Sequence, residues 1–230
     1  MNKRIFRFFA QPLILSLARV FPPTAKFAGL VALILVQGCA SITAMKTAKT
    51  LKAGQVSFAG QLNYSNTKIF PEDNESPNFT GADFMVTYGW TDHEEVSVRA
   101  SSWFTYFTFD YKRAIVSDGP VLFSLGAGLG GTMIDEGQSG VNAGGTTILD
   151  FYLPAYVDFV VSDMTTLFLV PRYILRTNPN ASSKTSQLGS SGGIKIGQES
   201  GIILEAAYSQ DINVSDVNYF QVGIAAFFNQ

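Results

Sequence analysis

Apolar and polar residues alternate with a period of two along most of the chain after residue 54. Between Leu149 and Phe159 every second residue is apolar, and the residues between them include Asp150 and Asp158. Alternation over this length is typical of a β-strand with one apolar and one polar face. The pattern recurs and predicts ten strands of about ten residues, at 55–64, 81–90, 95–104, 107–112, 121–130, 149–159, 167–176, 188–196, 202–208 and 220–229.

The distribution of residue types over the two faces indicates which environment each face meets. The charged residues of the predicted strands fall on the polar face, apart from Arg113. Soluble strands average about five or six residues, whereas about ten tilted residues cross a bilayer. Aromatic residues gather toward the ends of the apolar faces, as in interfacial girdles, at Tyr64, Trp90, Phe104, Phe107, Tyr173, Tyr208 and Phe228. We therefore expect residues 55–230 to form an all-β, antiparallel, up-and-down transmembrane β-barrel of about ten strands, with eight as the alternative.

The predicted connections alternate in length, except for a short one near Tyr106. Backbone groups that face lipid must be paired, so such a sheet has to close on itself. An even strand number then puts both termini on the side of the short turns, which is the periplasmic side of outer-membrane barrels. The short connections are 91–94, 117–120, 161–166 and 198–201, and the long ones are 65–80, 132–147, 177–187 and 209–218.

Composition excludes several classes of protein. One Cys and one His exclude a disulfide framework and zinc sites made of several such residues. A net charge of −2 gives no reason to expect a nucleic acid partner. His93 falls in a predicted periplasmic turn among acidic residues, where a solvated side chain is more common than a general base. We expect no cofactor, no metal and no enzymatic activity; a hydrolase that uses Asp150 or Glu205 is the least favoured alternative.

The N-terminal region has the layout of a secretory signal. Residues 1–38 contain five basic residues and no acid, and they include the apolar run Phe27–Val36, which is too short to span a membrane. The sequence Val36-Gln37-Gly38-Cys39 follows, and it resembles the lipobox of bacterial lipoproteins. This resemblance implies a signal peptide at 1–38, acylation of Cys39 and, because Ala40 is not Asp, sorting to the outer membrane. We expect residues 39–54 to form a lipidated, solvated tether.

The wider sequence resembles small, lipid-anchored outer-membrane β-barrel proteins of bacteria, through the lipobox, Gly89-Trp90-Thr91-Asp92 and the aromatic last strand, Tyr219–Gln230. The chain ends on Gln230, whereas barrels of this class usually end on an aromatic residue. The resemblance implies an anchor in the periplasmic leaflet of the outer membrane. It also implies contact with outer-membrane lipids and lipopolysaccharide, and passage through the barrel-assembly and lipoprotein-sorting machinery.

The polar faces together predict the lining of the barrel lumen. Charges persist in a low-dielectric interior when they are paired, so we expect a network of Asp83, Arg99, Lys112, Asp150, Asp158, Arg172, Arg176, Lys195 and Glu205. A barrel of this size is filled by its own side chains. The small lumen residues Gly126, Gly128, Gly130, Gly189 and Gly193 either make room for Trp103, Tyr152 and Tyr156 or leave a narrow cavity. The expected function is non-enzymatic, structural or surface-interacting, and the alternative is a narrow channel or a carrier of a small ligand.

Overall fold

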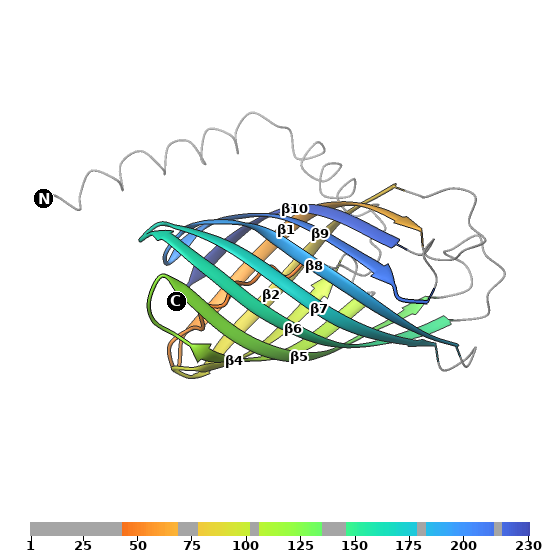
Figure 1. Cartoon of the computed structure of the whole chain (residues 1–230), viewed down its shortest axis with the longest axis horizontal. Coiled ribbons are helices and arrows are strands. Elements are labelled where there is room, and N and C mark those ends of the chain that lie inside the picture. Colours follow the sequence, from red (N-terminus) through yellow and green to blue (C-terminus); the bar gives the residue numbers. More distant parts are fainter. Residues whose placement is uncertain (1–42, 69–77, 102–105, 135–145, 179–182, 214–217) are drawn as a thin grey trace, which may run out of the picture. The chain divides into compact units, whose positions relative to one another are not determined.

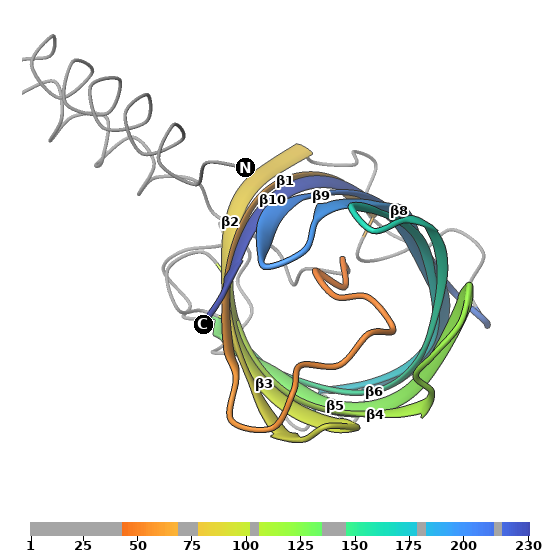
Figure 2. The same cartoon turned by 90° about the vertical axis from the view of Figure 1, so that its left-hand side faces the viewer.

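Ten antiparallel strands form a closed barrel in a computed structural model of the chain (Figures 1 and 2). The structure describes residues 43–68, 78–101, 106–134, 146–178, 183–213 and 218–230. Each strand pairs with its neighbours in sequence, and β1 pairs with β10 to close the sheet. Within these ranges no helix has both the length and the apolar character needed to cross a membrane.

The observed strands confirm the prediction of ten rather than eight. They are β1 (Val56–Lys68), β2 (Asn78–Thr91), β3 (Glu94–Ser101), β4 (Tyr106–Val116), β5 (Val121–Ile134), β6 (Thr146–Ser162), β7 (Thr165–Asn178), β8 (Ser183–Gly197), β9 (Ser200–Asp211) and β10 (Asn218–Asn229). Each overlaps one predicted strand. Most are longer than predicted, because backbone pairing continues beyond the residues whose side chains alternate.

The two ends of the barrel differ as expected. Tight turns between β2 and β3, β4 and β5, β6 and β7, and β8 and β9 lie at the end where β1 begins and β10 ends, here called the short-turn end. The other connections lie at the opposite, loop end. The predicted long loop at 177–187 is wrong, because β8 already begins at Ser183 and its polar residues Ser183–Gln187 pair with Asn178–Ile174 of β7. Backbone hydrogen bonds extend this strand although its side chains give no apolar alternation.

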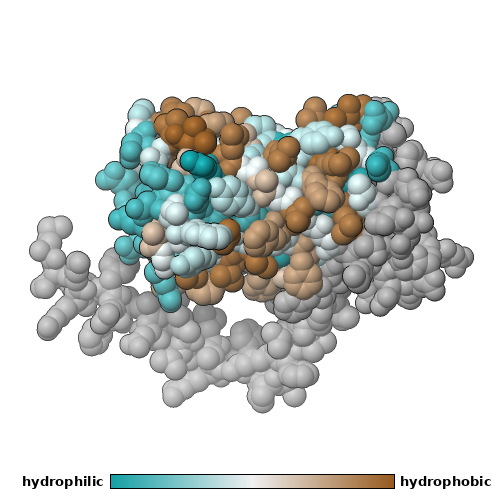
Figure 3. Space-filling model, turned by 90° about the horizontal axis from the view of Figure 1, so that it is seen from below, coloured by the Kyte–Doolittle hydropathy of each residue, from teal (hydrophilic) through white to brown (hydrophobic). Residues whose placement is uncertain are grey.

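The outer surface of the barrel is apolar. Leu62, Phe84, Leu153 and Ile224 expose 57%, 64%, 61% and 50% of their surface, and they belong to a set of outward-facing aliphatic and aromatic residues here called the outer belt. Figure 3 shows hydrophobic residues over the side of the barrel and hydrophilic residues gathered toward one end. Arg113 is an exposed cation, as the sequence indicates.

The lumen is occupied by the chain itself. Residues 43–51, here called the plug, run inside the ring of strands and leave it at the short-turn end (Figure 2). Thr43, Met45, Thr47 and Ala48 are each at most 5% exposed. The expected solvated tether over 39–54 is therefore wrong for these residues, because lumen side chains take the place of water around the backbone. Residues 39–42 lie outside the described part of the chain.

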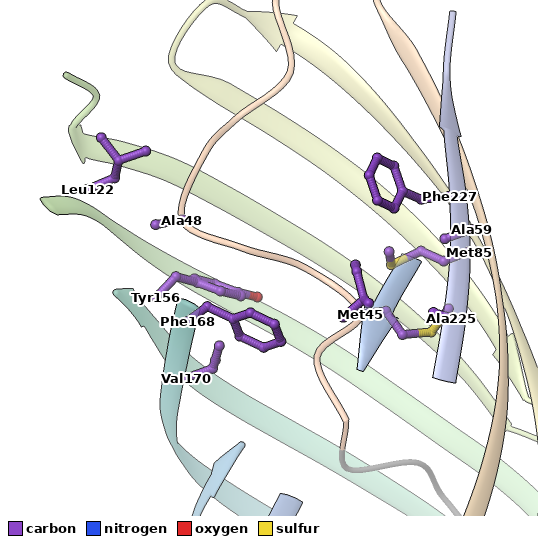
Figure 4. Packing of buried hydrophobic residues seen from close by; sticks show 11 residues of the cluster. Met45, Ala48, Ala59, Met85, Leu122, Tyr156, Phe168, Val170, Ala225 and Phe227 are labelled. Carbon is purple, nitrogen blue, oxygen red and sulfur yellow. The ribbon is translucent and has the colours of Figure 1, made fainter. Parts of the chain in front are cut away.

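Apolar residues inside the barrel pack against the plug. Met45 and Ala48 belong to a buried cluster with inward-facing residues of several strands (Figure 4). The other members are Ala59, Met85, Leu122, Tyr156, Phe168, Val170, Ile203, Ala225 and Phe227. The barrel thus has an apolar core toward its short-turn end, and the plug contributes the central part of it.

The path from the plug into β1 depends on two glycines. Gln55 N–H donates to the Lys52 carbonyl at 3.0 Å, and Gly54 between them has a φ of 81°, which glycine adopts without steric cost. Gly89 of β2 lies directly beneath this turn. A Cβ on Gly89 would collide with the Lys52 carbonyl oxygen and would lie 3.1 Å from Cβ of Leu51. The chain can therefore cross the rim close to β2 only because residue 89 has no side chain.

Candidate functional site

Lumen carboxylates hold the plug by its backbone amides. Glu205 on β9 accepts hydrogen bonds from the N–H groups of Ala44 at 2.5 Å and Met45 at 3.0 Å. Asp158 on β6 accepts from Ala48 at 2.7 Å and from Lys49 at 3.2 Å. Hydrogen bonds to an ionised acceptor are stronger than those between neutral groups. Each carboxylate therefore fixes a pair of consecutive residues of the plug.

Lumen cations bind the plug carbonyls in the same way. Arg99 on β3 donates to the Thr43 carbonyl at 2.6 Å. Lys112 on β4 donates to the carbonyls of Thr47 at 2.6 Å and Lys49 at 3.0 Å. Acidic groups on β6 and β9 and basic groups on β3 and β4 thus satisfy the donors and acceptors of a segment that has no strand partner. This matters because a buried, unpaired backbone group costs about 1–3 kcal/mol.

Neutral side chains complete the contacts along the plug. Thr43 donates from its hydroxyl to Gln61 Oε1 at 2.7 Å and from its backbone N–H to Gln221 Oε1 at 3.2 Å. The Ser124 hydroxyl donates to the Ala48 carbonyl at 2.5 Å. These partners come from β1, β10 and β5. The plug is therefore held from several sides of the barrel.

One residue of the plug has an uncommon backbone conformation. Met45 has a φ of 54°, a region that costs a residue with a side chain about 1–2 kcal/mol. Its N–H group is bound by Glu205, and its side chain lies in the buried cluster. Packing and a charged hydrogen bond thus oppose the steric cost.

A charged cluster lies where the plug approaches the short-turn end. Glu95 on β3 pairs with Lys112 at 2.9 Å and with Lys46 of the plug at 3.7 Å, and it accepts from the Leu51 N–H at 3.0 Å. Lys46 also donates to the Ser97 hydroxyl. Burial lowers the pKa of the Lys46 ammonium, against the opposite effect of the Asp110 and Glu95 carboxylates.

A second cluster lies toward the loop end. The Arg176 guanidinium on β7 binds both oxygens of Asp150 on β6 at 2.8 Å. It also donates to the Tyr219 hydroxyl at 2.5 Å, and Tyr106 donates to Asp150 at 3.0 Å. This bidentate pair, with two tyrosines around it, joins β4, β6, β7 and β10 across the lumen.

The nine charged residues predicted for the lumen all lie on the inner face of the barrel. Asp83, Arg99, Lys112, Asp150, Asp158 and Glu205 are buried, and Arg172, Arg176 and Lys195 are half-buried. The contacts differ from an interconnected set of ion pairs, because Arg99, Lys112, Asp158 and Glu205 bind the plug. The remaining contacts are local: Asp83 accepts from Asn63 at 2.8 Å, Arg172 donates to Ser191 at 2.7 Å, and Lys195 lies over the Phe227 ring.

Of the two outcomes expected for the small lumen residues, room for tyrosine side chains is observed at Gly126 and Gly128, whereas Gly189 lies against Ser209 and Gly193 against Phe168 and the Leu204 carbonyl. A Cβ on Gly128 would collide with the Tyr152 ring, and one on Gly126 would lie 3.1 Å from Tyr156. Gly130 accommodates Tyr106 in the same way, which the sequence did not indicate. Trp103, like the lipidation candidate Cys39, lies outside the described residues.

Sequence reasoning missed the plug, although a signal for it exists. Met85, Phe168, Ile203 and Phe227 are large apolar residues at inward-facing positions, where alternation predicts polar ones. Apolar side chains on a lumen face need an apolar neighbour inside the barrel. Residues 43–51 supply that neighbour, but their composition resembles that of a linker.

The residues considered as catalytic either make structural contacts or lie exposed outside the lumen. His93 lies exposed in the turn between β2 and β3. The two carboxylates considered for a hydrolase, Asp150 and Glu205, use both oxygens in the contacts given above. Across the described residues, no group of three or more His, Cys, Asp or Glu side chains is arranged to hold a metal ion.

No protein-family model matches the sequence, and no curated protein matches it. Among solved structures, the chain is similar to the attachment invasion locus protein Ail of Yersinia pestis, with 11% identity over 78% of this chain and 100% of that one, at a TM-score of 0.33. It is also similar to an outer membrane channel from Pseudomonas putida F1, with 9% identity over 82% and 100% of the two chains and a TM-score of 0.43. The translocator domain of the autotransporter NalP from Neisseria meningitidis matches with 9% identity over 78% and 89%, at a TM-score of 0.39. These likenesses are too distant to bear on function.

Proposed function

We propose that this chain is a non-enzymatic β-barrel of the bacterial outer membrane whose lumen is closed by its own N-terminal segment. Its role is structural or surface-interacting. The observation that carries the proposal is the combination of an apolar outer belt with a lumen filled by the plug. A closed sheet satisfies its backbone groups within the wall, so the outer belt can face hydrocarbon and lipid molecules, including lipopolysaccharide.

The contacts inside the barrel support a non-enzymatic role. A general acid or base has to be within reach of a substrate with a free proton-accepting or proton-donating atom. Asp150 is held by Arg176 and Tyr106, and Glu205 is held by two backbone amides of the plug. Both carboxylates act as structural acceptors in this arrangement.

A narrow channel is the second candidate, and the way the plug is held favours it. Lumen side chains bind the plug largely through its backbone, and residues 43–51 belong to none of the ten strands. Withdrawal of the plug would leave a lumen lined by the charged and polar groups that now bind it. In that case the plug acts as a gate.

Single-channel recording in planar bilayers tests the closed lumen and separates the two candidates. The wild-type chain should give no discrete openings. A variant in which a Gly/Ser linker of equal length replaces residues 43–51 should give openings if the empty lumen conducts. Openings of the wild-type chain would refute the closed lumen. The absence of openings in both proteins would rule out the channel candidate and leave the structural role.

We further propose acylation of Cys39 and an anchor in the periplasmic leaflet, with export through the lipoprotein-sorting and barrel-assembly machinery. The position of the plug limits how far Cys39 can reach toward the leaflet. Cys39 lies four residues before Thr43, so the segment between them spans at most about 14 Å. Thr43 binds Gln61, which lies five residues into β1, or about 16 Å along the strand. Because barrel strands are tilted by about 35–45°, this is a depth of about 12 Å, and the chain must then also cross the rim and the thickness of the wall to reach the leaflet. Acylation of Cys39 and complete insertion of the plug therefore oppose each other.

A further inference from the structure

A small cavity lies between the plug and the barrel wall at the short-turn end. Its volume is about 60 Å³. Four lysines line it, Lys46 and Lys49 from the plug and Lys112 and Lys195 from the wall, and Glu95 is the one carboxylate among its lining residues. Basic groups therefore outnumber acidic ones in its lining.

Glu95 does not neutralise all four ammonium groups. It forms ion pairs with Lys112 at 2.9 Å and with Lys46 at 3.7 Å, and its second oxygen accepts from the Leu51 N–H. Both oxygens of the carboxylate are thereby used. The charges of Lys49 and Lys195 remain without this counterion, and like charges near a low-dielectric wall repel one another.

Lys195 is the central residue of the site. It is half-buried on β8, and its ammonium lies 4.6 Å from the centroid of the Phe227 ring. Within the described part of the chain, no carboxylate lies within ion-pair distance of it. A cation–π contact contributes about 0.5–2 kcal/mol and uses none of the three N–H donors of the ammonium, so these donors can bind water or an anion in the cavity.

We propose that this cavity binds a small oxyanion of the phosphate type. Lysine ammonium groups bind phosphate as point charges, and the hydroxyls of Ser57 and Thr87 in the same lining can donate as well. One water-sized sphere needs about 10–15 Å³, so the cavity has room for the few heavy atoms of such an anion. The lining residues face the interior, which separates the site from lipid headgroups outside the wall.

Because the lysines come from both the plug and the wall, binding of an anion affects how firmly the plug is held. Two of the ammonium groups belong to the plug and two to the wall, so a bound anion links the two parts. Phosphate should therefore hold the plug in the lumen more firmly. The proposal depends on an inserted plug, and it does not depend on a membrane role for the barrel.

Titration calorimetry with the purified full chain in detergent tests the site, with inorganic phosphate as the probe and chloride at equal ionic strength as the reference. Wild type should bind phosphate saturably. Lys195→Met should weaken binding about tenfold or more, as expected for the loss of a charged hydrogen bond. Arg113→Gln, which removes an exposed cation near the same end, should leave the affinity unchanged. Glycerol 3-phosphate should bind less tightly than inorganic phosphate, because the cavity is small.

The outcomes decide the proposal. The absence of saturable binding to wild type would overturn it, and so would equal affinities of wild type and Lys195→Met. Equal losses in Lys195→Met and Arg113→Gln would show general charge attraction and would also overturn it. Lys49→Gln changes an exposed side chain at the mouth and serves as a second variant if Lys195→Met does not fold. An affinity of Lys49→Gln equal to wild type would then count against the site.

Discussion

The Asp158 carboxylate accepts a hydrogen bond from the backbone N–H of Ala48 at 2.7 Å, across 110 positions of sequence. Its other oxygen accepts from the next amide, that of Lys49. Glu205 binds Ala44 and Met45 in the same manner further along the lumen. The barrel thus binds the main chain of the segment that fills it.

Asp158→Asn should loosen the plug without unfolding the barrel. An amide keeps one acceptor oxygen but places an NH₂ group against a backbone N–H, so one charged hydrogen bond is lost at a cost of about 1.5–3 kcal/mol. Hydrogen exchange at Ala48 and Lys49 should accelerate about tenfold to hundredfold. Glu199→Gln, which changes an exposed acid at the short-turn end, is the control. Equal exchange in the two variants would show that Asp158 does not hold the plug.

Leu62→Arg should destabilise the folded barrel in lipid vesicles by about 2–4 kcal/mol, because an arginine at mid-belt would face hydrocarbon. Leu62 is 57% exposed near the middle of the barrel wall. Val161→Arg, near the turn between β6 and β7, should cost only about 0–1 kcal/mol. Denaturant titration in vesicles measures both. Equal and small costs at the two positions would mean that the outer belt faces water.

Gly89→Ala should displace the point where the plug leaves the lumen. The added Cβ collides with backbone, which cannot rotate away as a side chain can. We expect faster hydrogen exchange over residues 51–54 and a smaller effect at Thr43. Gly119→Ala is a suitable comparison, since Gly119 has a φ of 97° and open space around it. That variant should show local strain of about 1–2 kcal/mol and no change in the plug. Unchanged exchange at 51–54 in Gly89→Ala would contradict the close crossing.

Cys39→Ser should hold the start of the plug in the lumen more firmly than an acylated wild-type chain does. Without an acyl group nothing pulls residue 39 toward the leaflet, so amides of Thr43 to Met45 should exchange more slowly. Wild-type protein refolded without acylation should behave like Cys39→Ser. Mass spectrometry of the envelope protein establishes whether the lipid is present. Identical exchange of acylated and non-acylated chains would remove the proposed competition.

The sequence was sufficient to predict the wall of the barrel because each strand repeats the same two-residue pattern. The segment from Leu149 to Phe159 illustrates this, since apolar residues of the outer face alternate there with residues of the lumen face without interruption. β8 was predicted too short, because its first residues are held by backbone pairing with β7 rather than by side-chain pattern. Side-chain periodicity reports burial and contains no information on such pairing.

The plug could not be predicted in the same way, because its backbone is satisfied by distant side chains. Thr43 meets partners on β1, β3 and β10, and no spacing in the sequence brings these together. The charged lumen residues were predicted at inward-facing positions, and Asp150 and Arg176 do pair with each other. Arg99, Lys112, Asp158 and Glu205 were expected to pair in the same way, whereas they bind the backbone of the plug. The large inward-facing residues Met85, Phe168, Ile203 and Phe227 were the sign in the sequence of an apolar occupant.

The pairing of β1 with β10 has a consequence for how the molecule is made. This seam extends from Ser57 opposite Asn229 to Lys68 opposite Asn218, and it encloses residues that precede every strand. The plug precedes every strand in the chain, and the barrel around it is closed only when the last strand, β10, pairs with β1. An open sheet whose final edge is still unpaired can admit residues 43–51 from the side, whereas a sealed cylinder admits them only through its rim. If the plug enters before β10 pairs with β1, its apolar side chains Met45 and Ala48 are already in place when Ala225 and Phe227 of β10 pack into the same cluster.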